Sequence, residues 1–381
     1  TVNELGPLYL ALIGVAVLPD VVGGGTGSVG DQVELALSAL TAVGLVVVAG
    51  RSWRARHHLQ QALESTLPDG WRSRRAPRSE SRHRRGPSLR AAFAPWPIRP
   101  RSVERHSDIE YGDAGVANRL DVYRHRSRPP AAPTLIHLHG GHFRWGGKSR
   151  EARPLLHRLA SRGWTCISAN YRLSRTPGEG FPDHLVDVKR VLAWAREHAD
   201  EHGIDPDAIV LTGSSAGAHL TAMAALTAGD PAFQPGFEEA DTTVAAAVGF
   251  YGYYGPLGTP DETPSTPLAY DAAGAPPFLL VHGTHDTYTP LEGARAFARH
   301  LRTASSNPVV LAALPGAQHS FDVVGSVRYE AVVDAVEAFA GFALHRRRTS
   351  ATGDGRGAAL PTARAQVAAE PVHDRAGADH G

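Results

Sequence analysis

The chain opens with two apolar stretches that contain no charged residue. They cover residues 5–19 and 35–50, and a Gly-rich link joins them. Each stretch is slightly shorter than the roughly 20 residues that span a bilayer as a helix, although polar flanks can complete the span. The pattern predicts an apolar helical hairpin over residues 1–50 that is inserted in a membrane. A pair of core helices packed on the next domain is the alternative.

A different pattern begins near residue 106, where short apolar runs alternate with longer amphipathic segments. The strand-like runs are 117–123, 134–138, 164–169, 208–212, 244–250, 278–282 and 308–314. The segments with helical spacing of apolar residues are 151–161, 183–202, 216–227, 291–303 and 328–343. This alternation predicts an α/β domain over residues 106–345, with a mostly parallel sheet and helices on both faces. Ligands then bind at the carboxyl ends of the strands.

Charge divides the chain at the same places. The net charge of +1 combines −4 over residues 1–50, +10 over 51–105, −7 over 106–345 and +2 over 346–381. The segment 51–105 is rich in Arg and Pro and lacks the pattern of a nucleic-acid-binding module. We therefore predict a flexible linker that touches anionic lipid, with no nucleic-acid partner. The tail 346–381, rich in Ala, Gly and Arg, is predicted to be disordered.

The positions of the basic residues and the cysteine content give two further expectations. Basic residues flank membrane helices on the cytoplasmic side, so the hairpin ends and the α/β domain are expected in the cytoplasm, with the Gly-rich link outside. The only cysteine is Cys166, which excludes a small domain held together by disulfides.

A Gly-x-Ser-x-Gly sequence follows the predicted strand 208–212 directly. It reads Gly213-Ser214-Ser215-Ala216-Gly217 and precedes a predicted helix. In this strand–turn–helix setting the central serine lies on a strained turn with its hydroxyl exposed above the sheet. We predict Ser215 as the nucleophile and expect Ser214 to point elsewhere.

The sequence His139-Gly140-Gly141 closes the predicted strand 134–138. Small residues let backbone N–H groups turn toward a developing oxyanion, so Gly140, Gly141 and Ala216 are the predicted oxyanion hole. His137, His139 and His142 are interpreted as structural, because no carboxylate or cysteine set accompanies them. We expect neither a metal nor an organic cofactor.

A serine nucleophile needs a base, and the base needs an orienting acid. Asp286 follows the predicted strand 278–282, and His319 follows 308–314. The chain order Ser, Asp, His, each after its own strand, is the order that an α/β-hydrolase sheet requires. His282 and His285 are the rival bases, and Asp271 and Asp322 are the rival acids.

Taken together, these segments resemble α/β-hydrolase esterases of the His-Gly-Gly group, which includes bacterial carboxylesterases, hormone-sensitive-lipase-like enzymes and feruloyl-esterase-like enzymes. The similar stretches are HLHGGHFRWGG, ANYRLS, FPDHLVDVKRVLAW, GSSAGAHL, HGTHDTYTP and GAQHSFD. The resemblance implies an eight-stranded sheet and a triad of Ser215, Asp286 and His319. The chain departs from the group at His142, where relatives usually have a small residue, and at Ala218, where many have glycine. Its N-terminal segments resemble membrane-tethered esterases of actinobacteria, which implies a bacterial inner membrane.

The resulting prediction is a serine hydrolase that cleaves small carboxylic esters of short to medium acyl chain through an acyl-enzyme. His142, Phe143, Trp145 and Tyr251 are candidate pocket residues, although such aromatic residues can equally be core packing. Two alternatives stay open. One is an arylformamidase or other amide hydrolase with the same triad, and the other is a non-catalytic ligand-binding protein on this fold.

Overall fold

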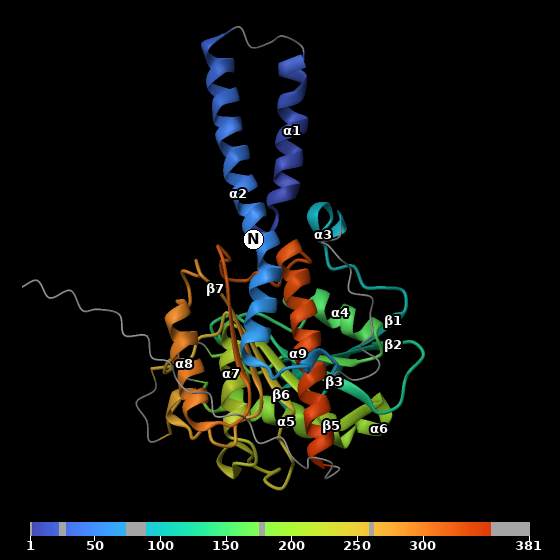
Figure 1. Ribbon diagram of the computed structural model, residues 1–381. Coiled ribbons are helices and arrows are strands. Elements are labelled where there is room, and N and C mark those ends of the chain that lie inside the picture. The colour runs from blue at the N-terminus through green and yellow to red at the C-terminus, as the bar shows by residue number, and fades with distance from the viewer. Residues whose placement is uncertain (1, 23–27, 74–88, 175–179, 259–262, 352–381) are drawn as a thin grey trace, which may run out of the picture.

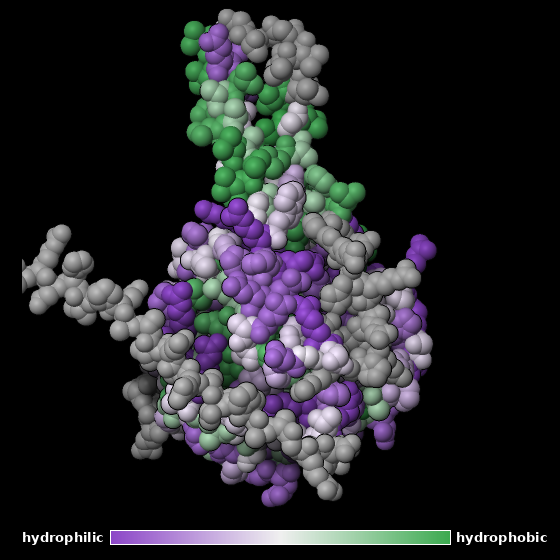
Figure 2. Space-filling view, viewed as in Figure 1, coloured by the Kyte–Doolittle hydropathy of each residue, from purple (hydrophilic) through white to green (hydrophobic). Residues whose placement is uncertain are grey.

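The computed structural model describes residues 2–22, 28–73, 89–174, 180–258 and 263–351. It consists of an α/β body from which a pair of long helices projects at one end (Figure 1). Figure 2 shows hydrophobic residues over the projecting helices and mostly hydrophilic residues over the visible face of the body.

The body is built on an eight-stranded sheet with the order β1-β2-β4-β3-β5-β6-β7-β8. β2 pairs antiparallel with both β1 and β4, and every other pair is parallel. This confirms the predicted fold class. The strands are β1 (Val103–Glu110), β2 (Arg119–His125), β3 (Ala132–Leu138), β4 (Thr165–Ala169), β5 (Ile204–Ser214), β6 (Ala246–Phe250), β7 (Phe278–Gly283) and β8 (Val309–Leu314).

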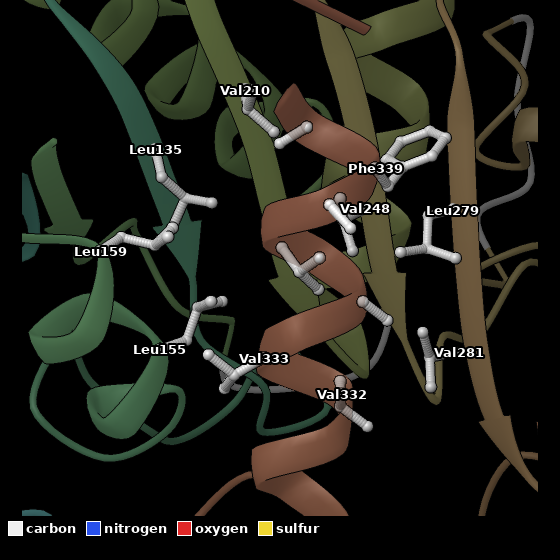
Figure 3. Packing of buried hydrophobic residues seen from close by; sticks show 14 of the residues in the cluster. Leu135, Leu155, Leu159, Val210, Val248, Leu279, Val281, Val332, Val333 and Phe339 are labelled. Carbon is white, nitrogen blue, oxygen red and sulfur yellow. The ribbon is translucent and has the colours of Figure 1, made fainter. Parts of the chain in front are cut away.

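Helices cover both faces of this sheet. One apolar cluster joins α2 (Val29–Thr66), α4 and α9 to one face, and a second joins α5, α7 and α8 to the other. Figure 3 shows Val332, Val333 and Phe339 of α9 packed over the sheet residues of the first cluster. The helices of the body are α4 (Arg153–Ser161), α5 (Asp183–Glu197), α6 (Ala199–His202), α7 (Ala216–Leu226), α8 (Leu291–Ala304) and α9 (Val327–Ala351). Short 3-10 turns lie at Val2–Glu4, Trp71–Ser73, Gly115–Asn118, Pro231–Phe233 and Pro267–Ala269.

The predicted hairpin is formed by α1 (Gly6–Val22) and α2 (Val29–Thr66). Ser28 caps α2, because its hydroxyl accepts from the Asp31 N–H over 3.1 Å while the Asp31 carboxylate accepts from the Ser28 N–H. Among the described helices, only α2 is long and apolar enough to cross a membrane. α1 is a shorter apolar helix that packs beside it.

The structure differs from the prediction in the segment that was expected to be a flexible linker. α2 does not end at residue 50 but runs on as one helix to Thr66. The reason is a return of apolar residues at helical spacing, because Ala55, Leu59 and Leu63 are buried in the cluster shared with α9. The same segment is tied to α9 by an ion pair of 2.7 Å between Arg56 and Asp334.

Two more boundaries differ. Helix α3 (Leu89–Phe93) and the first three residues of β1 also fall within the expected linker, and α9 extends through residues 346–351 of the expected tail. β1 lacks a run of apolar residues because it is an edge strand, and Val103 is its only buried residue. Residues 74–88 and 352–381, where linker and tail were predicted, lie outside the described residues.

Cys166 lies on β4 with no solvent exposure, and burial raises the pKa of its thiol. Because the thiolate is the reactive form, we expect this cysteine to react with a maleimide at least about 100-fold more slowly in the folded protein than in guanidinium chloride. Mass spectrometry over a time course measures both rates. Rapid labelling of the folded protein would contradict the burial of β4.

Candidate active site

Ser215 lies in the tight turn between β5 and α7. Its backbone is held at φ 54° and ψ −113°, a strained conformation for a residue with a side chain. Its N–H donates to the Phe250 carbonyl over 2.9 Å. The flanking glycines are required sterically, because a Cβ at Gly213 or Gly217 would lie 2.1 Å or 2.2 Å from a backbone oxygen. The turn therefore places the Ser215 hydroxyl above the carboxyl ends of the strands, as the Gly-x-Ser-x-Gly sequence predicts.

The predicted base and acid lie in line with this hydroxyl. His319, on the loop after β8, has its Nε2 3.0 Å from Ser215 Oγ and its Nδ1 2.8 Å from Asp286 Oδ2. Asp286, on the loop after β7, accepts from the backbone N–H groups of Tyr288 and Thr289 at 2.9 and 3.0 Å. The pKa of Asp286 is lowered: desolvation by burial acts to raise it, and hydrogen bonds from His319 and the Thr289 N–H outweigh that effect. Asp286 is thus held as an anion beside the imidazole.

The structure places the rival residues away from Ser215. His282 donates to the Thr289 carbonyl over 2.6 Å and lies 3.6 Å from Asp286, while His285 is exposed and contacts Thr284. The Asp271 carboxylate accepts from the Ala273 N–H. Asp322 accepts from the Ser214 hydroxyl over 2.6 Å, which confirms that Ser214 points away from the pocket.

The loop that follows β3 and carries Gly140, Gly141 and His142, here called the oxyanion loop, differs from the prediction at Gly140. The single N–H of Gly140 donates to Glu151 Oε2 over 2.7 Å, so it is not available to a developing oxyanion. Within the described part of the chain, the N–H groups of Gly141, His142 and Ala216 have no hydrogen-bond acceptor. Gly141 and His142 have positive φ values, 128° and 54°, and His142 lines the same pocket as Ser215 and Ala216.

Glu151 and Asp322 are two buried carboxyl groups beneath the oxyanion loop, and no sequence signal suggested that they would meet there. Glu151 is 2% exposed, and Asp322, fully buried, also binds the Tyr251 hydroxyl. Burial and the nearby Asp322 raise the pKa of Glu151 to about 7, and burial also raises the pKa of Asp322. At neutral pH the pair therefore holds a proton that two exposed carboxylates would release.

This buried pair predicts a pH-dependent stability. Because the pKa of Glu151 is higher in the fold than in the unfolded chain, its neutral form stabilises the fold at acidic pH, and that contribution is lost as the pH rises through about 7. Glu151→Gln keeps an acceptor for the Gly140 N–H and cannot ionise. We expect the melting temperature of the wild type, relative to this variant, to fall by several degrees (~5 °C) between about pH 5.5 and 8.5.

Thermal unfolding by circular dichroism at these two pH values measures the effect. The matched control is Glu110→Gln, because Glu110 is an exposed acid on β1. Its melting temperature should follow that of the wild type at both pH values. Parallel curves for Glu151→Gln and the wild type would show that Glu151 ionises normally in the fold.

A pocket of about 510 Å³ adjoins Ser215. Of the predicted pocket residues, His142, Phe143 and Trp145 line it, but Tyr251 does not. Tyr251 is fully buried with its hydroxyl on Asp322 and its ring against His319, so it packs beneath the site. The other lining residues are Arg144, Ser215, Ala216, Tyr253, Pro256, Leu257, Tyr288 and Thr289. Tyr288 and Thr289 were not predicted, although their place directly after Asp286 is a signal that points to them.

The histidines near the oxyanion loop occupy different environments. His139 is buried, its ring stacks on Tyr171 at 4.4 Å, and its Nδ1 lies 2.7 Å from the Gly140 oxygen. His137 is buried in β3, and burial lowers its pKa to about 3. The described residues contain no group of three His, Cys, Asp or Glu side chains that could hold a metal ion.

Comparison with known proteins gives matches over most of the chain. The BD-FAE family model matches residues 120–256, and the TAP-like protein model matches residues 253–338. The chain is 40% identical to the probable carboxylic ester hydrolase LipM of Mycobacterium tuberculosis, over 80% of this chain and 76% of that protein. It is 39% identical to the esterase LipQ of the same organism, over 78% of each chain. The esterase LipC, also from that organism, is 33% identical over 86% of this chain and 90% of its own.

Solved structures show the same fold. Esterase 2 of Thermogutta terrifontis, phosphorylated by paraoxon, superposes with a TM-score of 0.53 at 26% identity, over 62% of this chain and 93% of that chain. A truncated carbohydrate esterase from gut microbiota superposes with a TM-score of 0.52 at 19% identity, over 66% of this chain and 99% of that chain.

Proposed function

The chain belongs to the α/β-hydrolase family of carboxylic ester hydrolases, and on that premise we propose that it cleaves esters through an acyl-enzyme on Ser215. The observation that carries this proposal is the unbroken line of contacts from Ser215 through His319 to Asp286, at 3.0 and 2.8 Å. These are hydrogen-bonding distances for a nucleophile, its base and the acid that orients the base.

In the first step His319 Nε2 accepts the proton of Ser215 as the oxygen attacks the ester carbonyl. The tetrahedral oxyanion accepts hydrogen bonds from the free N–H groups of Gly141, His142 and Ala216, each worth about 3 kcal/mol. The C–O bond to the alcohol then breaks, and the alkoxide leaves with the proton that His319 returns. Asp286 keeps the imidazole in the tautomer that has its proton on Nδ1.

In the second step His319 removes a proton from water, which attacks the acyl carbon of the acyl-Ser215 ester. The same N–H groups stabilise the second oxyanion, and Ser215 leaves with the proton as the carboxylic acid is released. The pocket walls are largely aromatic and apolar, as Phe143, Trp145 and Leu257 show, and the volume of about 510 Å³ favours esters with a short to medium acyl chain.

Turnover of p-nitrophenyl esters of increasing acyl length by the full chain tests this proposal. We expect kcat/KM to be highest for short to medium acyl chains. An N-formyl aryl substrate in the same assay separates the ester hydrolase from the arylformamidase alternative, which predicts the opposite order of kcat/KM. Absence of ester turnover by folded protein would contradict the proposal.

We also propose that the hairpin is inserted in a bacterial inner membrane, with α2 crossing it up to about residue 48 and the shorter α1 packed beside it. Large apolar side chains such as Val15 and Leu40 are more than two-thirds exposed, at 73% and 70%, as a lipid-facing surface requires. The length of α2 from Val29 to residue 48 is about 30 Å, which matches the hydrocarbon thickness of a bilayer. Arg51 and Arg54 follow at the base, with the exposed Trp53 between them, and this pattern favours a cytoplasmic catalytic domain.

Vesicle flotation tests the membrane proposal. The full chain, reconstituted in phosphatidylcholine vesicles, is expected to float with the lipid and to resist extraction by alkaline carbonate. Release into the carbonate supernatant would contradict membrane insertion. The hairpin would then be a peripheral element or a pair of helices packed on the protein.

A further inference from the structure

The base of the hairpin contacts the loop that carries His319. Asn3 donates from its side chain to the carbonyl of Gly316 over 3.2 Å, and Gly316 lies three residues before His319. The Arg51 side chain lies over the same glycine, with its Cδ 2.7 Å from the position that a Cβ would occupy. Both ends of the hairpin therefore meet the body beside the catalytic histidine.

A second set of contacts fixes the start of the chain at this place. Glu4 is nearly fully buried, accepts from the Ser326 hydroxyl over 2.6 Å and forms an ion pair with the fully buried Arg328. Both partners lie where α9 begins, shortly after the His319 loop. Since a buried ion pair is costly to break, these contacts hold the hairpin base against the body.

The orientation of the hairpin is set by α2 as well. This helix is continuous from the hairpin tip into the core, where Leu59 and Leu63 pack against the cluster shared with α9. It contains no proline, and its glycines are Gly30, Gly44 and Gly50, all before the part that packs on the body. The hairpin is therefore joined to the body by one unbroken helix.

These contacts determine which end of the body faces the membrane. β3, β5, β6, β7 and β8 are parallel, so their carboxyl ends lie at one edge of the sheet, and that edge carries the pocket loops and the His319 loop. The hairpin projects from the body at the end where its base contacts the His319 loop (Figure 1). A bilayer around the hairpin would therefore face this edge of the sheet, with the pocket loops between the sheet and the lipid.

Exposed apolar side chains gather at the same end. At the pocket, Trp145 is 50% exposed and Tyr288 68% exposed. Beside the hairpin, α3 contacts α1 and presents Leu89, which is 80% exposed, together with Phe93. Aromatic and aliphatic residues in such a position suit the interface between water and lipid.

From this arrangement we infer that the active site takes its substrate from the bilayer: an amphipathic ester anchored in the leaflet that adjoins the catalytic body. The inference rests on the proposed esterase activity and on the proposed membrane insertion of the hairpin. The bond that is cleaved lies near the surface of the leaflet, where the Ser215 pocket can reach it, and the lipid anchor of the substrate stays in the membrane.

The experiment uses the full chain in phosphatidylcholine vesicles and two probes with the same scissile bond. One is 4-methylumbelliferyl butyrate, and the other is the same ester with a dialkyl anchor on the ring that prevents exchange between vesicles. The anchored probe is placed either in the vesicles that hold the protein or in separate vesicles. We expect hydrolysis at least about 100-fold faster in the shared vesicles, because enzyme and substrate are then confined to one surface.

Each outcome has a defined meaning. Equal hydrolysis in shared and separate vesicles, or no hydrolysis of the anchored probe while the free probe is cleaved, overturns the inference and leaves the esterase activity standing. Failure of the chain to float with the vesicles also overturns the inference, because the hairpin is then not inserted in the membrane. Loss of activity on both probes contradicts the proposed esterase itself, and Ser215→Ala gives the background rate in every arm.

Discussion

Ser215→Ala is expected to lower kcat for a p-nitrophenyl ester by about 10⁵-fold, because no acyl-enzyme can form without the hydroxyl. KM should change little, since the oxyanion donors and the aromatic pocket stay in place. The small alanine side chain fits the strained turn as well as serine does, so the fold should be retained. Steady-state kinetics with the purified full chain measures the effect.

Covalent labelling provides the control for this prediction. A fluorophosphonate probe should label the wild type and leave Ser215→Ala unlabelled. Ser214→Ala should still be labelled, because the Ser214 hydroxyl donates to Asp322 and does not reach the pocket. Labelling of Ser215→Ala at another serine would assign the nucleophile to that residue.

Asp286→Asn is expected to lower kcat by about 10⁴-fold, the second largest effect. The amide would no longer hold the His319 imidazole in the tautomer that accepts the Ser215 proton, and it cannot stabilise the imidazolium that forms. Because the pKa of Asp286 is lowered in the fold, the wild-type residue remains an anion over the whole neutral range. The loss should therefore be seen at every pH from about 6 to 9.

Asp322→Asn is the matched comparison, because Asp322 is a rival candidate for the acid and lies near the catalytic loops. Its carboxylate binds the hydroxyls of Ser214 and Tyr251, and an asparagine oxygen can still accept from one of them. We expect a loss in kcat of about tenfold or less, with a change in melting temperature as the main effect. A larger kcat loss for Asp322→Asn than for Asp286→Asn would reverse the assignment of the acid.

The sequence predicted what depends on chain order and on local steric demands. The seven apolar runs became strands, and Ser215, Asp286 and His319 each follow one of them. The close approach of backbone at Gly213 and Gly217 explains why that motif could be recognised from five residues alone. These features need no knowledge of long-range contacts, because parallel strands bring their following loops to one edge.

Features that depend on long-range contacts could not be predicted from the same patterns. The loss of Gly140 as an oxyanion donor depends on Glu151, which comes from the segment leading into α4. The burial of Tyr251 depends on Asp322, 71 residues away in sequence. The continuation of α2 beyond residue 50 was not predicted, because arginines dominate this segment. Its few apolar residues form a buried helix face only where α9 packs against them.

The burial of Cys166 on β4 also makes the chain a natural background for site-specific labelling. With no other cysteine in the sequence, one introduced at an exposed position would be the only thiol that a reagent reaches in the folded protein. Gln32→Cys near the hairpin tip and Glu292→Cys on α8 would carry such reporters without any prior removal of native cysteines. A membrane-impermeant maleimide applied to intact cells should then distinguish the two positions by the side of the membrane on which each lies.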